Sequence, residues 1–308
     1  MEMTRRTLLA TASAAAAAGA LGGALRPAAA QTGELIRKTI PSTGDLVPVI
    51  GLGTARRYEE AKTDADLTPL RETVGQFRTL GGVVIDTAPS YGEAEAVMGR
   101  LVQDLGARKD LYLSTKVGAN DRADGAAQIE QSFKNLRTDR IDLISVHNLR
   151  DITNQLANIR DLKPAGRVRH VGATTSFDKQ YGDFEAMMRR ETLDWIQIDY
   201  ALDNRNAADR IIPLAKDRGM AVMINLPFGR GRLFKAVEGK PLPDWAKEID
   251  CTSWPQVFLK YLVSHEAVTC AVPGMAQARY VADNLAAARG RMPDAAMRRR
   301  MEQFIDGL

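Results

Sequence analysis

The sequence predicts an α/β fold, a (β/α)8 TIM barrel with an N-terminal hairpin and an extra C-terminal helix. Short apolar segments rich in β-branched residues alternate with amphipathic segments, as expected for parallel strands buried on both faces and their connecting helices. Eight such strands are expected, which is the number that closes this kind of barrel. They are residues 49–54, 83–87, 111–117, 142–148, 168–175, 195–202, 221–227 and 268–274.

An open, doubly wound sheet is the alternative architecture. Such a sheet usually carries the dinucleotide-binding motif G-x-G-x-x-G after its first strand. Here the segment reads Gly51-Leu52-Gly53-Thr54-Ala55-Arg56, so the third glycine is missing. The sequence therefore favours the closed barrel.

Helices are expected between the strands, where apolar residues recur at helical spacing. Gly106, Gly166 and Gly219 stand where three of these helices should end. The expected helices are residues 67–80, 93–105, 127–136, 184–190, 208–218, 255–264 and 276–288.

Three further segments complete the expected architecture. Residues 36–48 are predicted to form a hairpin that plugs one end of the barrel, and residues 294–306 an additional terminal helix. Residues 228–253 are longer than an ordinary strand–helix connection, and such loops are usually functional or disordered.

The composition is that of a soluble globular protein, with 45% apolar and 26% charged residues among 308. A formal charge of +4 without a basic stripe gives no reason to expect nucleic acid as a partner. The two cysteines, Cys251 and Cys270, lack metal-site spacing, so no metal is expected. We expect them to be unpaired packing residues, although a disulfide is the alternative.

The first 30 residues are predicted to be an export signal, and residues 31–308 the barrel domain. The paired Arg5 and Arg6 precede an uncharged, Ala-rich run from Thr7 to Leu25, which resembles a twin-arginine signal peptide. Cleavage is expected after Ala30, in a run of small residues, which predicts a periplasmic protein handled by the twin-arginine export machinery. The run is too weakly apolar for a stable membrane span. An uncleaved anchor and a disordered cytoplasmic tail are the alternatives.

Four polar residues stand at the carboxyl ends of three successive expected strands. Asp86 lies at the end of the second strand with Tyr91 just beyond it, Lys116 ends the third and His147 ends the fourth. Each residue by itself has an ordinary structural explanation. Asp86 could cap a turn and Tyr91 could line the mouth of the barrel. Lys116 could form a structural ion pair, and His147 could be a hydrogen-bonded core residue. Because the carboxyl ends of barrel strands meet at one face, however, we expect all four in one site.

These four side chains suit the reduction of a carbonyl group. A phenol is a weak acid at neutral pH, but the ammonium of Lys116 would stabilise the phenolate of Tyr91 and lower its pKa. Asp86 would hold the lysine, and His147 would orient the substrate oxygen. No side chain supplies hydride, so a nicotinamide cofactor is implied.

With these residues the sequence resembles the aldo-keto reductase family. The matching stretches begin at Gly51-Leu52-Gly53-Thr54, Asp86-Thr87-Ala88-x-x-Tyr91-Gly92 and Leu113-Ser114-Thr115-Lys116. They continue at Asp142-Leu143-Ile144-x-Val146-His147, Gln197, Phe228-Gly229-Arg230-Gly231 and Val272-Pro273-Gly274, followed by Asp283-Asn284. The resemblance implies a (β/α)8 barrel, Tyr91 as the general acid and NADP(H) as the favoured cofactor over NAD(H).

The resemblance also implies a cofactor site, although with departures. Thr174 and Thr175 stand where a Ser-Asn pair commonly holds the nicotinamide carboxamide, and Asn225 where an aromatic ring often stacks. Gly274, Met275 and Tyr280 replace common 2′-phosphate contacts, for which Arg279 could partly compensate. The expected cofactor residues are Gly53, Thr54, Thr174, Thr175, Gln197, Phe228, Gly229, Arg230, Gly231, Arg279 and Asn284.

The substrate side is expected to include Tyr58, Asn148 and Trp245. Arg56, Arg57 and Arg150 either face the mouth, which would favour an acidic substrate, or are solvated loop charges. The leading function is an exported reductase of an aldehyde, ketone or sugar carbonyl, and a non-catalytic nucleotide-binding sensor is the alternative. A metal-dependent hydrolase is the third and least supported function, because the three histidines stand at unrelated positions and form no metal-ligand cluster.

Overall fold

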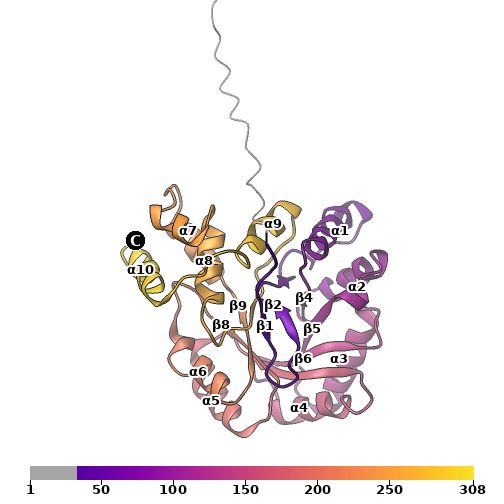
Figure 1. The fold of residues 1–308 in the computed structure, drawn as a ribbon. Helices are drawn as coiled ribbons and strands as arrows, with labels where there is room; N and C mark the ends of the chain where they lie inside the picture. Colours follow the sequence, from indigo (N-terminus) through magenta and orange to yellow (C-terminus); the bar gives the residue numbers. More distant parts are fainter. Residues whose placement is uncertain (1–32) are drawn as a thin grey trace, which may run out of the picture.

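The computed structural model describes residues 33–308, and the expected export signal lies outside them. Its centre is a barrel of eight parallel strands whose spatial order follows the sequence (Figure 1). Parallel bridges from Ile50 to Ala271 and from Gly53 to Gly274 join the last strand to the first. The strands are β3 (Leu52–Gly53), β4 (Val84–Asp86), β5 (Tyr112–Val117), β6 (Ile141–His147), β7 (Val168–Thr174), β8 (Trp195–Asp199), β9 (Ala221–Asn225) and β10 (Cys270–Ala271).

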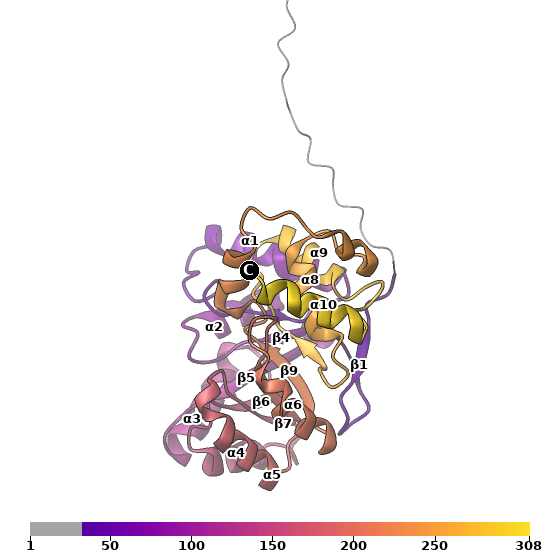
Figure 2. The same ribbon diagram turned by 90° about the vertical axis from the view of Figure 1, so that its left-hand side faces the viewer.

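Helices surround these strands and bury their apolar faces against them (Figures 1 and 2). The predicted barrel is confirmed. Seven of the eight expected strand segments contain one of its strands, and β6 begins one residue before the expected segment 142–148. The helices are α1 (Asp64–Thr79), α2 (Ala94–Asp104), α3 (Arg122–Asn135), α4 (Ile152–Asp161), α5 (Tyr181–Arg190), α6 (Ile211–Asp217), α7 (Arg232–Ala236), α8 (Trp254–Val263), α9 (Ala278–Ala286) and α10 (Ala295–Asp306).

Two of these helices were not expected from the sequence. Helix α4 buries Gln155 and Asn158 beside Leu156 and Ile159, so its buried face lacks a clear apolar period. The polar pair is satisfied by neighbouring groups, as in the 2.8 Å bond from Asn158 Nδ2 to the Arg122 carbonyl. Helix α7 lies within the long segment 228–253, which also holds the short 3-10 helices Gly229–Gly231 and Asp244–Ile249.

The N-terminal hairpin covers the amino end of the barrel. Its strands β1 (Arg37–Thr39) and β2 (Leu46–Pro48) pair antiparallel, as predicted. Ile40 and Val47 pack in one cluster with Val84, Tyr112 and Trp195, which stand at the amino ends of their strands. The hairpin thus plugs the end of the barrel opposite the strand carboxyl ends.

The C-terminal helix α10 packs beside the barrel, in agreement with the prediction. Arg298 on this helix donates a 2.9 Å hydrogen bond to the hydroxyl of Tyr200, just after β8. Cys251 and Cys270 are buried free thiols, so they form no disulfide. Among residues 33–308, no helix combines the length and the apolar character that a membrane crossing needs.

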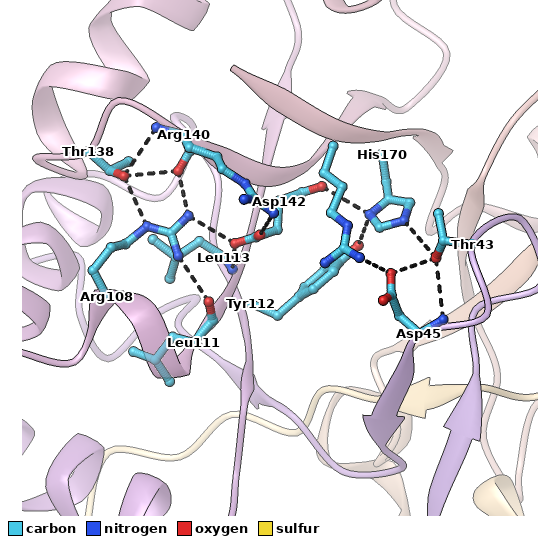
Figure 3. A network of polar contacts seen from close by, with 11 residues as sticks. Thr43, Asp45, Arg108, Leu111, Tyr112, Leu113, Thr138, Arg140, Asp142 and His170 are labelled. Carbon is cyan, nitrogen blue, oxygen red and sulfur yellow. Dashed lines mark hydrogen bonds and ion pairs between the residues drawn. The ribbon is translucent and has the colours of Figure 1, made fainter. Parts of the chain in front are cut away.

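A polar network ties the strands together near the hairpin (Figure 3). Asp142 is only 5% exposed and accepts 2.9 Å bonds from Arg108 Nη2 and from the backbone N–H of Leu113. Nearby, the Tyr112 hydroxyl and His170 Nδ1 lie 3.0 Å apart. Buried carboxylates need such partners, so Asp142 organises the starts of β5 and β6.

We expect Asp142→Asn to lower the free energy of unfolding by about 1.5–3 kcal/mol, because the bond from Arg108 loses its charged acceptor. Chemical denaturation would measure this change. Asp110→Asn is the control, since Asp110 pairs with Arg78 at an exposed site and should contribute about 0–1 kcal/mol. Equal losses of unfolding free energy in the two variants would contradict the stabilising role that we assign to Asp142.

Candidate active site

The barrel brings the four expected polar residues to one cavity. Asp86 ends β4, Lys116 lies in β5 and His147 ends β6, while Tyr91 stands in the turn before α2. All four line a cavity of about 590 Å³ at the carboxyl ends of the strands, called the catalytic cavity below. This is the face at which (β/α)8 barrels carry their active sites.

Asp86 and Lys116 form a buried ion pair at the floor of this cavity. Lys116 Nζ lies 2.9 and 2.8 Å from the two carboxylate oxygens and donates a 2.8 Å bond to the Thr87 carbonyl. Burial alone would lower the pKa of Lys116, but the negative charge of Asp86 and the contact with Tyr91 raise it above its ordinary value. Lys116 is therefore a permanent cation beside the phenol.

The Tyr91 ring lies against this cation, with Lys116 Nζ 5.2 Å from its centroid. Burial raises the pKa of Tyr91, and the Lys116 charge opposes the rise without reversing it. The expected net lowering of this pKa is therefore not found. Tyr91 keeps its proton at neutral pH, as a proton donor must, and Lys116 makes that proton easier to release than burial alone would allow.

His147 faces Tyr91 across the cavity. Their ring centroids are 6.2 Å apart and nearly perpendicular, and His147 Nδ1 lies 3.5 Å from the Ser90 hydroxyl. Burial and the Lys116 charge lower the pKa of His147 to about 4. The imidazole is therefore neutral at pH 7 and can donate one N–H to a substrate oxygen.

The expected cofactor residues divide into two groups. Thr175 does not line the catalytic cavity, and its Oγ1 lies 2.5 Å from Gln180 Oε1. Thr54 does line it, although its hydroxyl donates a 2.9 Å bond to Thr87 Oγ1. Asn284 is buried in α9, and the exposed Arg279 stacks on Tyr280 outside the cavity. The expected residues that line the catalytic cavity are Gly53, Thr54, Thr174, Gln197, Phe228, Arg230 and Gly231.

Two expected glycines are required by close packing. A Cβ at Gly53 would lie 2.8 Å from the Val272 carbonyl oxygen, where β3 approaches the segment after β10. A Cβ at Gly229 would lie 2.4 Å from Asp203 Oδ1, at a backbone φ of +56°. Gly229 therefore shapes the loop without lining the catalytic cavity.

The substrate residues are only partly placed as expected. Asn148 lines the catalytic cavity beside His147. The prediction for Tyr58 is wrong, because its side chain is fully buried and its hydroxyl donates a 2.9 Å bond to the Met275 carbonyl. The prediction for Trp245 is also wrong, because it is 5% exposed and packs on Phe304 of α10.

Ser176, which the sequence analysis did not select, lines the catalytic cavity just beyond β7. The family resemblance had assigned the nicotinamide contact to the preceding pair, Thr174 and Thr175. Ser176 comes directly after the expected strand 168–175, and this position at the carboxyl end of a strand was the sequence signal that could have identified it. Ser176 lines the catalytic cavity, whereas Thr175 does not.

The charges of the catalytic cavity fit a phosphate-bearing dinucleotide. Its lining holds Arg56, Arg57, Lys116 and Arg230 against Glu59 and Asp86, which leaves an excess of +2. Within residues 33–308, Arg56 and Arg57 have no carboxylate partner for their guanidinium groups. Asn225 Oδ1 is also buried there without a hydrogen-bond partner, a kind of acceptor that a carboxamide N–H would satisfy.

The fold and this cavity define a (β/α)8 barrel whose strand ends carry an acid–base site next to space for an anionic cofactor. The chain belongs to the Aldo/keto reductase family, whose family model matches residues 49–303. This match covers the barrel and most of the C-terminal helix.

Curated relatives and solved structures agree with this assignment. Aldo-keto reductase YhdN of Bacillus subtilis is 30% identical over 210 residues, which are 63% of this chain and 62% of the relative. The NADH-specific methylglyoxal reductase of Escherichia coli is 23% identical, over 60% of this chain and 64% of the relative. The chain thus spans somewhat less than two thirds of the length of these two proteins.

Among solved structures, an aldo-keto reductase from Klebsiella pneumoniae in complex with NADPH is similar with a TM-score of 0.73. It is 22% identical, and the match covers 88% of this chain and 95% of that one. The holo form of AKR11C1 from Bacillus halodurans has a TM-score of 0.71 at 21% identity, with 88% and 96% covered. These similarities support the fold.

Proposed function

We propose that the protein is a nicotinamide-dependent reductase of an aldehyde, ketone or sugar carbonyl, with Tyr91 as its proton donor. The observation that carries this proposal is the meeting of Tyr91, Lys116, Asp86 and His147 in one cavity. His147 would hold the carbonyl oxygen through its N–H, and Tyr91 would protonate that oxygen. The bound nicotinamide would supply the hydride.

Cofactor binding would involve the side chains that the catalytic cavity offers. Thr174 and Gln197 would meet the nicotinamide end, while Arg230 and the loop at Gly231 would meet phosphate. We propose NADP(H) over NAD(H), because the Arg279 guanidinium has no carboxylate partner among the described residues and lies 4.9 Å over the Tyr280 ring. Both NADPH and NADH appear in the names of similar proteins.

We also propose that the protein is exported by the twin-arginine route and acts in the periplasm. The support is the pair Arg5 and Arg6 before the Ala-rich run, together with the small residues at Ala28-Ala29-Ala30. This route carries folded proteins, so the cofactor would be bound before export. Protein purified from the periplasm without any bound nucleotide would contradict that loading step.

A non-catalytic nucleotide-binding protein is the second candidate, and one observation favours it. Asn225 lines the cavity where a stacking aromatic ring is common, and its Nδ2 donates a 3.3 Å bond to the Thr175 carbonyl. Such a protein would bind the nucleotide but would reduce no carbonyl. Turnover of any aldehyde by the purified protein would eliminate it.

Nucleotide titration tests the cofactor proposal. Trp254 stacks on Phe258, which contacts Phe228 at the cavity, so tryptophan fluorescence should report binding. We expect NADPH to bind more tightly than NADH, and Arg279→Ala to weaken NADPH binding about 10- to 100-fold while sparing NADH, because one charged hydrogen bond is lost.

Arg300→Ala is the control for this titration, since Arg300 forms an exposed ion pair with Glu248 on the side of the barrel. It should alter neither affinity. Equal weakening of both nucleotides by Arg279→Ala would refute the preference for NADP(H). Failure of both nucleotides to bind wild-type protein would refute the proposed function itself.

A further inference from the structure

The turn that follows His147 has a strained backbone. Asn148, Leu149 and Asp151 have φ angles of +53°, +58° and +44°, in the left-handed region that residues other than glycine seldom adopt. Asparagine and aspartate tolerate this region better than leucine does. Such conformations cost free energy and persist only where the surrounding structure holds them. We call residues 148–151 the strained turn.

Gln180 holds the strained turn from the side of β7. Its Nε2 donates a 3.2 Å hydrogen bond to the Asn148 carbonyl, and its Oε1 accepts the 2.5 Å bond from Thr175 Oγ1. Thr175 directly follows β7, and its backbone N–H donates a 3.0 Å bond to the Gln197 carbonyl in β8. The Gln180 amide therefore connects the strained turn to the carboxyl ends of two strands.

Arg150 holds the strained turn from the side of β5. Its Nη1 donates a 3.0 Å bond to the carbonyl of Gly118, the residue after β5. His147 packs against the same residue, because a Cβ built on Gly118 would lie 3.3 Å from the His147 Cβ. Arg150 thus fixes the backbone that limits the position of the imidazole.

The direction of the imidazole depends on this backbone. Within residues 33–308, the hydrogen-bond contact of the His147 ring is the 3.5 Å approach of Nδ1 to the Ser90 hydroxyl, and a contact of that length is weak. His147 and Asn148 both line the catalytic cavity, whereas Arg150 and Gln180 do not. The two outer side chains can therefore influence a reaction only through the turn that they hold.

We propose that Gln180 and Arg150 are positioning residues for carbonyl reduction, which hold the strained turn and so fix His147 and Asn148 next to the substrate oxygen. The proposal rests on the proposed reductase function, because it takes His147 as the group that holds this oxygen. Loss of either contact lets the turn relax away from its strained conformation. A displacement of about 1 Å in an active site can lower the rate about 10²-fold.

Gln180→Met and Arg150→Met test the proposal, since each removes one contact and keeps a long side chain. We expect kcat/KM for the reduction of pentanal by the full chain, with NADPH, to fall about 10- to 100-fold in each variant. The dissociation constant of NADPH, measured by tryptophan fluorescence, should not change, because the strained turn lies on the substrate side of the cavity. This split separates positioning of the carbonyl from cofactor binding.

Arg289→Met and Gln131→Met are the matched controls. Arg289 Nη2 donates a 3.1 Å bond to the Leu80 carbonyl, and Gln131 Nε2 a 2.8 Å bond to Asn135 Oδ1. Each control loses a side-chain hydrogen bond away from the carboxyl ends of the strands. We expect melting temperatures similar to those of the test variants and an unchanged kcat/KM.

NMR of the imidazole provides a readout without turnover, and the chain has three histidines to assign. The His147 ring signals should shift or broaden in the two test variants and stay unchanged in the controls. Arg150→Met also removes a charge that, after burial and Lys116, lowers the pKa of His147. Gln180→Met removes no charge, so a change in that variant reports the position of the ring.

Two outcomes distinguish the positioning role from the reductase function. An unchanged kcat/KM in both test variants would overturn the positioning role while leaving the reductase function intact. Wild-type protein that reduces no aldehyde with either nucleotide would instead count against the reductase function. In that case, unchanged His147 signals in Gln180→Met would also overturn the role of Gln180 in holding the turn.

Discussion

Replacing Tyr91 by Phe is expected to lower kcat for carbonyl reduction by about 10²- to 10⁴-fold, the usual contribution of a positioned acid. The ring would remain in the cavity, so nucleotide binding should be unaffected. Only the proton on the phenol oxygen is lost, and neutral His147 is not a comparable donor because burial and Lys116 hold its pKa at about 4. Consumption of NADPH and fluorescence titration would measure the two effects separately.

Tyr112→Phe is the matched control for this experiment. Tyr112 is also buried, but it lies at the hairpin end of the barrel, where its hydroxyl is 3.0 Å from His170 Nδ1. The variant loses this contact, so its free energy of unfolding should fall while its kcat stays at the wild-type value. A Tyr91→Phe enzyme that reduced aldehydes within tenfold of the wild-type rate would exclude Tyr91 as the acid.

Replacing Lys116 by Met is expected to lower the free energy of unfolding by about 3–5 kcal/mol, because Asp86 would stay buried without its counter-ion. Asp86 is 4% exposed, and Ser114 Oγ at 2.9 Å would be a remaining donor. The pKa of His147 should rise from about 4 toward 6.5, since a positive neighbour is removed. Chemical denaturation and NMR titration of the imidazole would measure these changes.

Two controls separate charge burial from the loss of a lysine. Lys216→Met breaks an exposed ion pair with Glu266 and should change stability by about 0–1 kcal/mol. The double variant Asp86→Asn with Lys116→Met should recover part of the loss, because no unpaired charge remains. Equal losses in the Lys116 and Lys216 variants would show that the buried pair has no special role.

The pKa of His147 also predicts how wild-type stability depends on pH. In the unfolded chain this group would have an ordinary pKa of 6.5, and in the folded protein the pKa is about 4. Between these values the unfolded state binds more protons, so the histidine contributes stability above pH 6.5 that is lost as the pH falls toward 4.

The sequence by itself determined the barrel and the convergence of four chemical groups. Buried parallel strands show short β-branched runs whatever the details of their packing. The carboxyl ends of such strands meet at one face, so Asp86, Lys116 and His147 could be placed together from their positions at strand ends alone. Tyr91 followed because it stands five residues after Asp86, in the same loop.

Only the tertiary structure decided which loop side chains face the catalytic cavity. Tyr58 turns inward because its hydroxyl meets the carbonyl of Met275, 217 residues later in the chain. Thr175 turns toward Gln180, and Ser176 takes a place at the cavity. Loops have no repeating period that links residue number to direction, and the partners that orient their side chains come from distant segments.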